Sequence, residues 1–203
     1  SNGVQVWFVE AHEVPLVQVN LVVAAGSGDD PAGQYGLASL TAAMLDEGAG
    51  SRSALQLADE LDFLGANLST TSSFDASGVR LNVPVSRLAQ ALPLMADVAL
   101  RPTFPQAELD RVRRERITAL LQARDDAAAV APQAFARIVF GTTHRYGTGA
   151  AGTEQTLEAF RADDLRQFHV ARYRPRQATL VVVGDVTATG VLPLLERHFG
   201  GWR

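Results

Sequence analysis

The sequence predicts an α+β domain in which helices pack on one face of a mostly antiparallel sheet. Two observations carry this prediction. Segments of strand-like composition gather in the first half of the chain and recur once near its end, and runs of helical periodicity fill the stretches between them. The chain also has 203 residues, 47% of them hydrophobic, which is enough for a single domain with its own core.

Five segments are rich in β-branched or alternating residues and are expected to be strands. They are residues 4–10, 14–25, 67–74, 77–85 and 178–186. Only three residues separate the first two segments, and this short connection predicts a hairpin between them. The third segment is polar, as expected for a strand at an exposed edge of the sheet.

Eight segments have apolar residues at helical spacing. They are residues 35–46, 53–64, 86–100, 106–124, 127–140, 153–159, 163–173 and 187–199. Ser53 and Ser86 stand at the starts of two of these segments, and we expect their side chains to cap the helices. Gly65 is expected to end the helix that Ser53 begins.

The composition excludes several classes of protein. The chain has no cysteine, which removes disulfide scaffolds, thiolate metal sites and a cysteine nucleophile. Its net charge is −4, so nothing suggests a nucleic-acid partner. No stretch of about 18 consecutive apolar residues is present, so we expect no transmembrane segment.

The residues alone offer no assembled catalytic site. None of the four histidines has a second histidine three to five residues away, so a helical metal pair is not expected. The sequence Gly26-Ser27-Gly28 lacks the rest of a phosphate-binding loop, and the chain contains no lysine. The charged run at residues 108–116 is interpreted as a solvated helix face with ion pairs between successive turns.

Residues 36–48 resemble the signature helix of the M16 zinc peptidases, the family of insulinase, pitrilysin and mitochondrial processing peptidase. In active members this helix reads Gly-Leu-Ala-His-x-x-Glu-His-Met-Leu-x-x-Gly. The positions that match are Gly36, Leu37, Ala38, Met44, Leu45 and Gly48. Ser39 and Ala43 stand where the family has its two zinc-binding histidines, and Ala42 stands where it has its general-base glutamate.

The resemblance continues through nearly the whole chain. The matching segments include residues 24–31, 64–70, 101–116, 140–147, 173–185 and 199–202. The segment that begins at Arg101 resembles the entry to the helix that carries the third zinc ligand, a glutamate. That ligand is expected near Leu121 or Gln122, and neither residue is a carboxylate.

A catalytic zinc ion needs three nitrogen or carboxylate ligands and an open position for water, and hydrolysis needs a general base. The family positions named above supply neither. The resemblance therefore implies that this chain has no metal site, no catalytic residue and no cofactor of its own, with zinc expected in a catalytic partner. Residues 1–203 would form one M16 N-terminal-like domain, cut from a longer two-domain chain.

The function that the resemblance implies is that of an inactive half. Such a half pairs with a zinc-bearing M16 subunit and closes a chamber around an unfolded peptide. Its expected partners are the second domain of its own chain, the catalytic subunit and the peptide. The candidate peptide-binding strand is Asn67, Leu68, Ser69, Thr70, Thr71 and Ser72, whose edge a peptide could join by strand addition. A solvated edge strand with no ligand is an equal alternative.

Two further readings stay open. The chain could be a purely structural scaffold, like the core subunits of a respiratory complex. It could also be an independent hydrolase that uses His144, Tyr146, Asp125 and Asp126, although their spacing does not resemble a catalytic triad. An exported, periplasmic location is favoured by analogy with bacterial members of the family, with the cytoplasm as the alternative.

Overall fold

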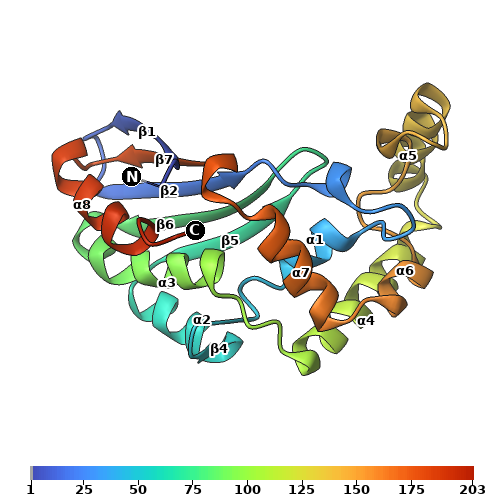
Figure 1. Ribbon diagram of the computed structural model, residues 1–203, viewed down its shortest axis with the longest axis horizontal. Coiled ribbons are helices and arrows are strands. Elements are labelled where there is room, and N and C mark those ends of the chain that lie inside the picture. The colour runs from blue at the N-terminus through green and yellow to red at the C-terminus, as the bar shows by residue number, and fades with distance from the viewer. Residues whose placement is uncertain (1) are drawn as a thin grey trace.

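The computed structural model describes residues 2–203 and contains one five-stranded mixed sheet (Figure 1). Its strands run in the order β1-β7-β2-β6-β5. Their bounds are β1 Gln5–Glu10, β2 Leu16–Val23, β5 Asn67–Ser72, β6 Ser77–Pro84 and β7 Ala178–Gly184. A separate short pair joins β3 (Gly48–Ala49) to β4 (Arg52–Ser53). The pairing of β1 with β7 is parallel and the other pairings in the large sheet are antiparallel, which confirms the mostly antiparallel sheet.

The expected hairpin between the first two strands is wrong, because β7 lies between them. Val182 of β7 is opposite Phe8 of β1 on one side and opposite Val19 of β2 on the other. The reason is the apolar character of β7, whose alternate residues are buried. A strand of this kind gains most from a place inside the sheet, where both of its edges are paired. The three-residue spacing between β1 and β2 could not reveal this, because β7 follows more than 150 residues later.

All eight expected helices are present. Their bounds are α1 Leu37–Ala43, α2 Ala54–Phe63, α3 Leu88–Leu100, α4 Gln106–Ala123, α5 Ala127–Phe140, α6 Glu154–Ala159, α7 Ala162–Arg172 and α8 Ala188–Phe199. The first is shorter than the expected segment 35–46. Gly36 has a φ of 98°, which is outside the helical region, so α1 cannot begin before Leu37.

The expected cap at Ser53 is confirmed. Its hydroxyl accepts a hydrogen bond from the Gln56 backbone N–H at 3.3 Å, and the Gln56 side chain accepts one from the Ser53 N–H at 3.0 Å. Gly65 follows α2 with a φ of 61°, as a helix-ending glycine should. The expected cap at Ser86 is wrong. A single 3-10 turn, Val85–Arg87, comes between β6 and α3, and the residue before α3 makes no side-chain cap.

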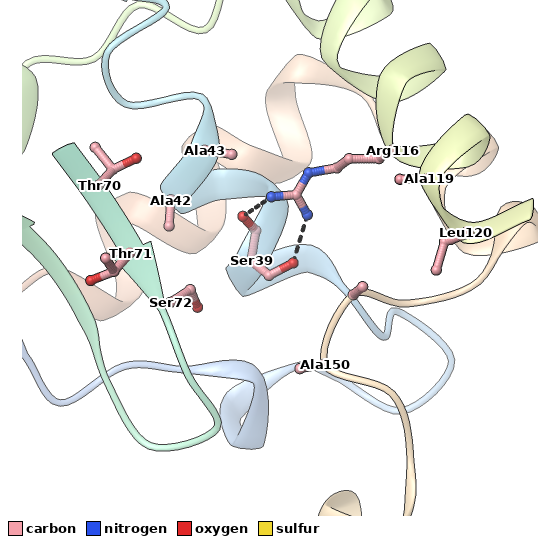
Figure 2. A pocket seen from close by; sticks show the side chains of 11 residues that line it. Ser39, Ala42, Ala43, Thr70, Thr71, Ser72, Arg116, Ala119, Leu120 and Ala150 are labelled. Carbon is pink, nitrogen blue, oxygen red and sulfur yellow. Dashed lines mark hydrogen bonds between the residues drawn. The ribbon is translucent and has the colours of Figure 1, made fainter. Parts of the chain in front are cut away.

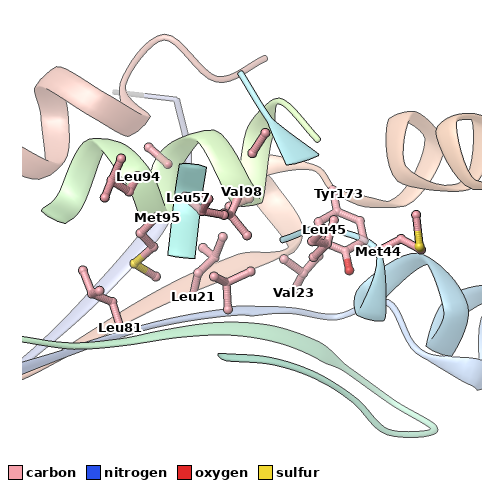
Figure 3. Packing of buried hydrophobic residues seen from close by; sticks show 14 of the residues in the cluster. Leu21, Val23, Met44, Leu45, Leu57, Leu81, Leu94, Met95, Val98 and Tyr173 are labelled. Atoms are coloured by element: carbon pink, nitrogen blue, oxygen red, sulfur yellow. The ribbon is translucent and has the colours of Figure 1, made fainter. Parts of the chain in front are cut away.

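The core lies between one face of the sheet and the helices α3, α8 and α1 (Figure 3). Alternate residues of β2, β6 and β7 are buried on this face, as the two-residue period of a strand requires. Leu21 and Leu81 meet Met95 and Val98 of α3 there. On the opposite face Trp7 is 64% exposed and Val9 is 53% exposed. The expected arrangement of helices on one face of the sheet is thus confirmed.

Of the remaining helices, α2 packs against α3 and α7 packs against α1, and both contribute residues to the core. In Figure 1, α4 and α6 lie beside α1, and α5 projects furthest from the sheet. Within residues 2–203, no helix has the length and apolar character needed to span a bilayer.

Candidate functional site

A cavity of about 520 Å³ opens where α1, β5 and α4 meet the loop before α6 (Figure 2). Most of its walls are small side chains. The lining residues are Ser39, Ala42, Ala43, Thr70, Thr71, Ser72, Arg116, Ala119, Leu120, Ala150 and Ala151. Arg116 is the one charged residue among these, and the pocket therefore combines apolar walls, a few hydroxyl groups and a single cation.

Asp30 fixes the start of α1, which forms one wall of this pocket. Its carboxylate accepts hydrogen bonds from the backbone N–H groups of Gly36 at 2.8 Å and Ala38 at 2.7 Å. The Arg145 guanidinium lies 2.9 Å from the same carboxylate. Burial raises the pKa of Asp30 above its ordinary value, although these three donors oppose that effect. The carboxylate thus works as a buried cap and anchor for α1.

Arg145 ties the opposite wall of the pocket to α1. Besides Asp30, its guanidinium donates to the Ser27 carbonyl at 2.9 Å, and it lies 4.1 Å from the centre of the Tyr35 ring. The Ser27 hydroxyl in turn donates to the Ala150 carbonyl at 3.2 Å. These contacts hold the loop with Ala150 and Ala151 against the beginning of α1.

Ser39, Ala42 and Ala43 share one side of α1, because residues three and four apart lie on the same helix face. Ala42 is buried, and the other two are half-buried at the pocket. The structure therefore brings together the three positions that the resemblance assigns to two zinc ligands and a general base.

On α4 the structure differs from the sequence expectation. Leu121 and Gln122 are exposed and do not line the pocket, whereas Leu120 does. Each residue turns the side chain about 100° around a helix axis, so a shift of one position moves it off the pocket-facing side. The pocket wall on α4 is formed by Arg116, Ala119 and Leu120, so the expected third-ligand position at Leu121 or Gln122 lies just past this wall. Neither Ala119 nor Leu120 is a carboxylate.

Arg116 reaches across the pocket from α4 to α1 (Figure 2). Its Nη1 donates to the Ser39 hydroxyl at 2.7 Å, and its Nη2 donates to the Ser39 carbonyl at 2.8 Å. No carboxylate forms an ion pair with Arg116 among residues 2–203. Burial lowers the pKa of the guanidinium, and no neighbouring carboxylate offsets this effect.

The sequence interpretation places Arg116, with the rest of residues 108–116, on a solvated helix face. That interpretation holds for Arg111, which pairs with Glu108 one turn before it and with Glu115 one turn after it. It fails for Arg116 because of the helix phase. The buried side of α4 carries Leu109 and Val112, and residue 116 lies two turns after 109 on the same side. Arg116 follows Leu109 and Val112 at helical spacing, and this arginine in an otherwise apolar stripe could have indicated its buried position.

The donor set of the pocket does not fit a zinc ion. Zinc in proteins binds imidazole, thiolate or carboxylate groups. Here α1 supplies the hydroxyl of Ser39 and the methyl groups of Ala42 and Ala43 to the pocket, and α4 supplies a guanidinium bonded to that serine and otherwise only apolar side chains. A divalent cation beside that guanidinium would also be repelled. Among residues 2–203 there is no group of three histidine, aspartate or glutamate side chains placed to hold a metal.

The strand β5 occupies the edge of the sheet, as expected from its polar sequence. It pairs with β6 on one side, and its other side carries no strand within the described part of the chain. Thr70, Thr71 and Ser72 line the pocket. Asn67 and Leu68 line a smaller cavity of about 200 Å³ beside α2. Ser69 lies between these two groups.

The residues considered for an independent hydrolase do not form a catalytic triad. They are His144, Tyr146, Asp125 and Asp126. His144 accepts a hydrogen bond from the Tyr146 backbone N–H at 3.1 Å, and the Tyr146 hydroxyl bonds to Asp75. Asp126 caps α5 by accepting from the Ala128 N–H at 2.9 Å. Asp126 and Tyr146 thus have partners outside any triad, and within the described residues no bond joins His144 to Asp125 or Asp126.

Comparison with known proteins matches most of the chain to two family models. The model described as insulinase (peptidase family M16) matches residues 5–146, and the model described as peptidase M16 inactive domain matches residues 159–203. A protein of Mycobacterium leprae described as an uncharacterized zinc protease is 26% identical over 199 residues, which cover 98% of this chain and 44% of that protein. A non-peptidase homolog, YmxG, of Helicobacter pylori is 25% identical over 193 residues, with 95% and 44% covered.

Solved structures show the same fold. A peptidase M16 inactive domain from Pseudomonas fluorescens superimposes with a TM-score of 0.93 at 26% identity, covering 98% of this chain and 48% of that one. The periplasmic protease PqqL from Escherichia coli superimposes with a TM-score of 0.89 at 22% identity, covering 99% of this chain and 23% of that one. The chain spans about half the length of the first curated relatives that it matches.

Proposed function

The chain belongs to peptidase family M16, and we propose that it is a catalytically inactive domain of that family, which binds peptide while a zinc-bearing half carries out hydrolysis. The first family model alone matches residues 5–146 of the 203, which shows membership of the family. The lack of catalytic activity and the binding of peptide are the two properties that we propose.

One observation carries the proposal. At Ser39, where the family resemblance places a zinc-binding histidine, the chain has a hydroxyl group bonded to the guanidinium of Arg116 at 2.7 Å. This arrangement provides a fixed positive charge instead of a Lewis acid, and Ala42 provides no base to take a proton from water. The pocket lies at the positions where the family resemblance places the zinc site, but its residues are better suited to binding a peptide than to hydrolysing one.

The edge strand β5 supplies the second part of the proposed role. A peptide that adds to a sheet edge is held by main-chain hydrogen bonds, which do not depend on its sequence. Thr70, Thr71 and Ser72 border the pocket, so a peptide paired with β5 would pass the mouth of the cavity. Short polar side chains at this edge leave room for varied residues of the peptide.

The proposed partners are the second domain of the same chain and a zinc-bearing M16 subunit. Relatives about twice as long as this chain support the first, since the match to this chain covers 44% and 49% of their length. The relative PqqL is described as a periplasmic protease. On that basis we propose an exported location for this protein too.

The proposal is tested by zinc content and peptide hydrolysis. The full-length protein would be assayed alone, and then mixed with a candidate zinc-bearing M16 subunit, which would also be assayed alone. We expect no stoichiometric zinc and no turnover from the protein alone, with turnover in the mixture exceeding that of the partner. Zinc and turnover in the protein by itself would contradict the inactive role. A mixture no more active than the partner would favour a structural scaffold instead.

A further inference from the structure

Arg116 is a half-buried cation that lines the pocket, and within residues 2–203 no carboxylate pairs with it. We propose that its guanidinium is a binding site for a carboxylate group of a peptide that lies along β5, supplied either by the peptide's C-terminus or by an Asp or Glu side chain. The inference rests on the proposed function, because its ligand is the same peptide. Strand addition at β5 alone would bind peptides of any sequence. A carboxylate site at Arg116 would make the protein prefer peptides that carry a carboxylate near this position.

The two bonds to Ser39 hold the guanidinium still without using all of it. Arginine has five N–H donors in one plane. Nη1 and Nη2 each give one hydrogen to Ser39, and Nε has no partner among the described residues. The side edge formed by Nε and one Nη therefore remains available. That edge has the spacing of the two oxygens of a carboxylate, so it can bind both at once.

Arg116 lacks the carboxylate partners that two other arginines near the pocket have within residues 2–203. Arg111 is paired with Glu47, Glu108 and Glu115, and Arg145 is paired with Asp30. Arg116 has only neutral oxygen atoms as partners within residues 2–203. A half-buried charge without a counter-charge is unfavourable, and a bound anion would relieve this cost.

The shape of the pocket admits such a ligand. Five alanines line it, so the volume of about 520 Å³ stays open in front of the guanidinium. Apolar walls lower the local dielectric constant, which strengthens the attraction between the two charges. The hydroxyl-bearing residues of β5 border the same cavity, which places the proposed path of the main chain beside the cation.

A carboxylate fits this pocket better than a phosphate group does. Phosphate sites generally gather several cations or backbone N–H groups around a doubly charged anion. Among the described residues Arg116 is the sole cation lining the cavity, and the remaining lining residues are neutral and, apart from Leu120, small. One planar guanidinium facing apolar walls matches one planar, singly charged group.

The test compares three unstructured peptides with the full-length protein, using fluorescence anisotropy. The first peptide lacks Asp and Glu and is amidated at its C-terminus, the second has the same sequence with a free C-terminus, and the third is amidated and contains one Glu. Binding of the fully neutral peptide reports on strand addition. The increase for the second or third peptide reports on Arg116 and shows which kind of carboxylate is bound.

Three variants complete the design. Arg116→Gln removes the charge and can still donate to Ser39, Arg116→Lys keeps the charge without the planar fork, and Arg114→Gln removes an exposed charge two residues away as the matched control. We expect Arg116→Gln to weaken binding of a carboxylate-bearing peptide at least about tenfold, and to leave the neutral peptide unchanged. Arg116→Lys should lose part of the preference, and Arg114→Gln should lose none.

The outcomes separate this inference from the proposed function. Equal binding of all three peptides by the unaltered protein would overturn the carboxylate site while leaving peptide binding in place. Equal weakening of neutral and charged peptides by Arg116→Gln would also overturn it, because Arg116 would then act only on the structure. Binding of no peptide at all would remove both proposals. Thermal unfolding of each variant shows whether the fold is intact.

Discussion

At the scale of single residues, the pocket depends on a few buried polar groups that connect distant parts of the chain. Asp30 joins the start of α1 to Arg145, which is 115 residues later in the sequence. Arg116 joins α4 to Ser39 across 77 residues. Neither partner could be identified from local spacing, because a carboxylate or guanidinium looks the same in sequence whether it is solvated or buried.

Asp30→Ala should lower the free energy of unfolding by about 3 kcal/mol, because it leaves Arg145 half-buried without a counter-charge and removes two caps from α1. Denaturant unfolding of the variant and the unaltered chain measures this. Asp163→Ala is the matched control. Its carboxylate is 80% exposed and pairs with Arg166, so its loss should change stability by less than about 1 kcal/mol. Similar losses in the two variants would contradict a special role for Asp30.

At the scale of elements, the helices were predictable and the strand pairings were less so. α5 begins and ends where its sequence indicates, since Asp126 caps it and Gly141 follows it. The cap at Ser53 is equally local. The position of β7 between β1 and β2 is a property of the whole sheet, and the short spacing of residues 11–13 pointed to a different neighbour.

Gly36 controls how closely α1 approaches the loop at the pocket. Its φ is 98°, and a Cβ at this position would lie 2.7 Å from the Ala151 carbonyl oxygen. Gly33 has a φ of 81° but has nothing within 4 Å of its Cβ position. Either substitution by alanine destabilises the fold because both backbones are left-handed, and Gly36→Ala also places its Cβ too close to the Ala151 carbonyl.

We therefore expect Gly33→Ala to lower the free energy of unfolding by about 1 kcal/mol and Gly36→Ala to lower it by at least twice as much. Denaturant unfolding of the two variants gives the comparison. Peptide binding by the more damaging variant should also weaken, because the loop with Ala151 would move away from α1. Equal effects of the two substitutions on stability would show that the close approach is not important.

At the scale of the whole molecule, stability should depend on pH through His169. This residue of α7 is buried, and its Nε2 donates to the Ala99 carbonyl in α3 at 2.9 Å. The rings of Phe104 and Tyr173 lie beside it. Burial lowers the pKa of His169 below its usual 6.5. Neutral histidine is thus favoured in the folded state, so its contribution to stability is complete above about pH 6.5 and is lost as the pH falls below that value.

The free energy of unfolding should accordingly fall more steeply from pH 7 to pH 5 in the unaltered chain than in His169→Gln, which keeps a donor for Ala99. His12→Gln is the control of opposite sign, because the exposed His12 has its pKa raised by Asp185. Protonated His12 stabilises the folded state increasingly as the pH falls, so the free energy of unfolding of His12→Gln should fall more steeply than that of the unaltered chain. His198 also has its pKa lowered by burial and should retain part of the slope. Parallel curves for the unaltered chain and His169→Gln would contradict this account.

Local periods of two or 3.6 residues were enough to predict the helical segments and the edge position of β5. The family was predicted from the resemblance of residues 36–48 and the segments that follow, and the same resemblance implies that Ser39 and Ala43 stand at metal-ligand positions. The tertiary structure alone decided that β7 separates β1 from β2, that Leu120 faces the pocket in place of Gln122, and that Arg116 fills part of it. Strand order and the partner of a buried charge depend on competition among distant groups, and only folding brings those groups together.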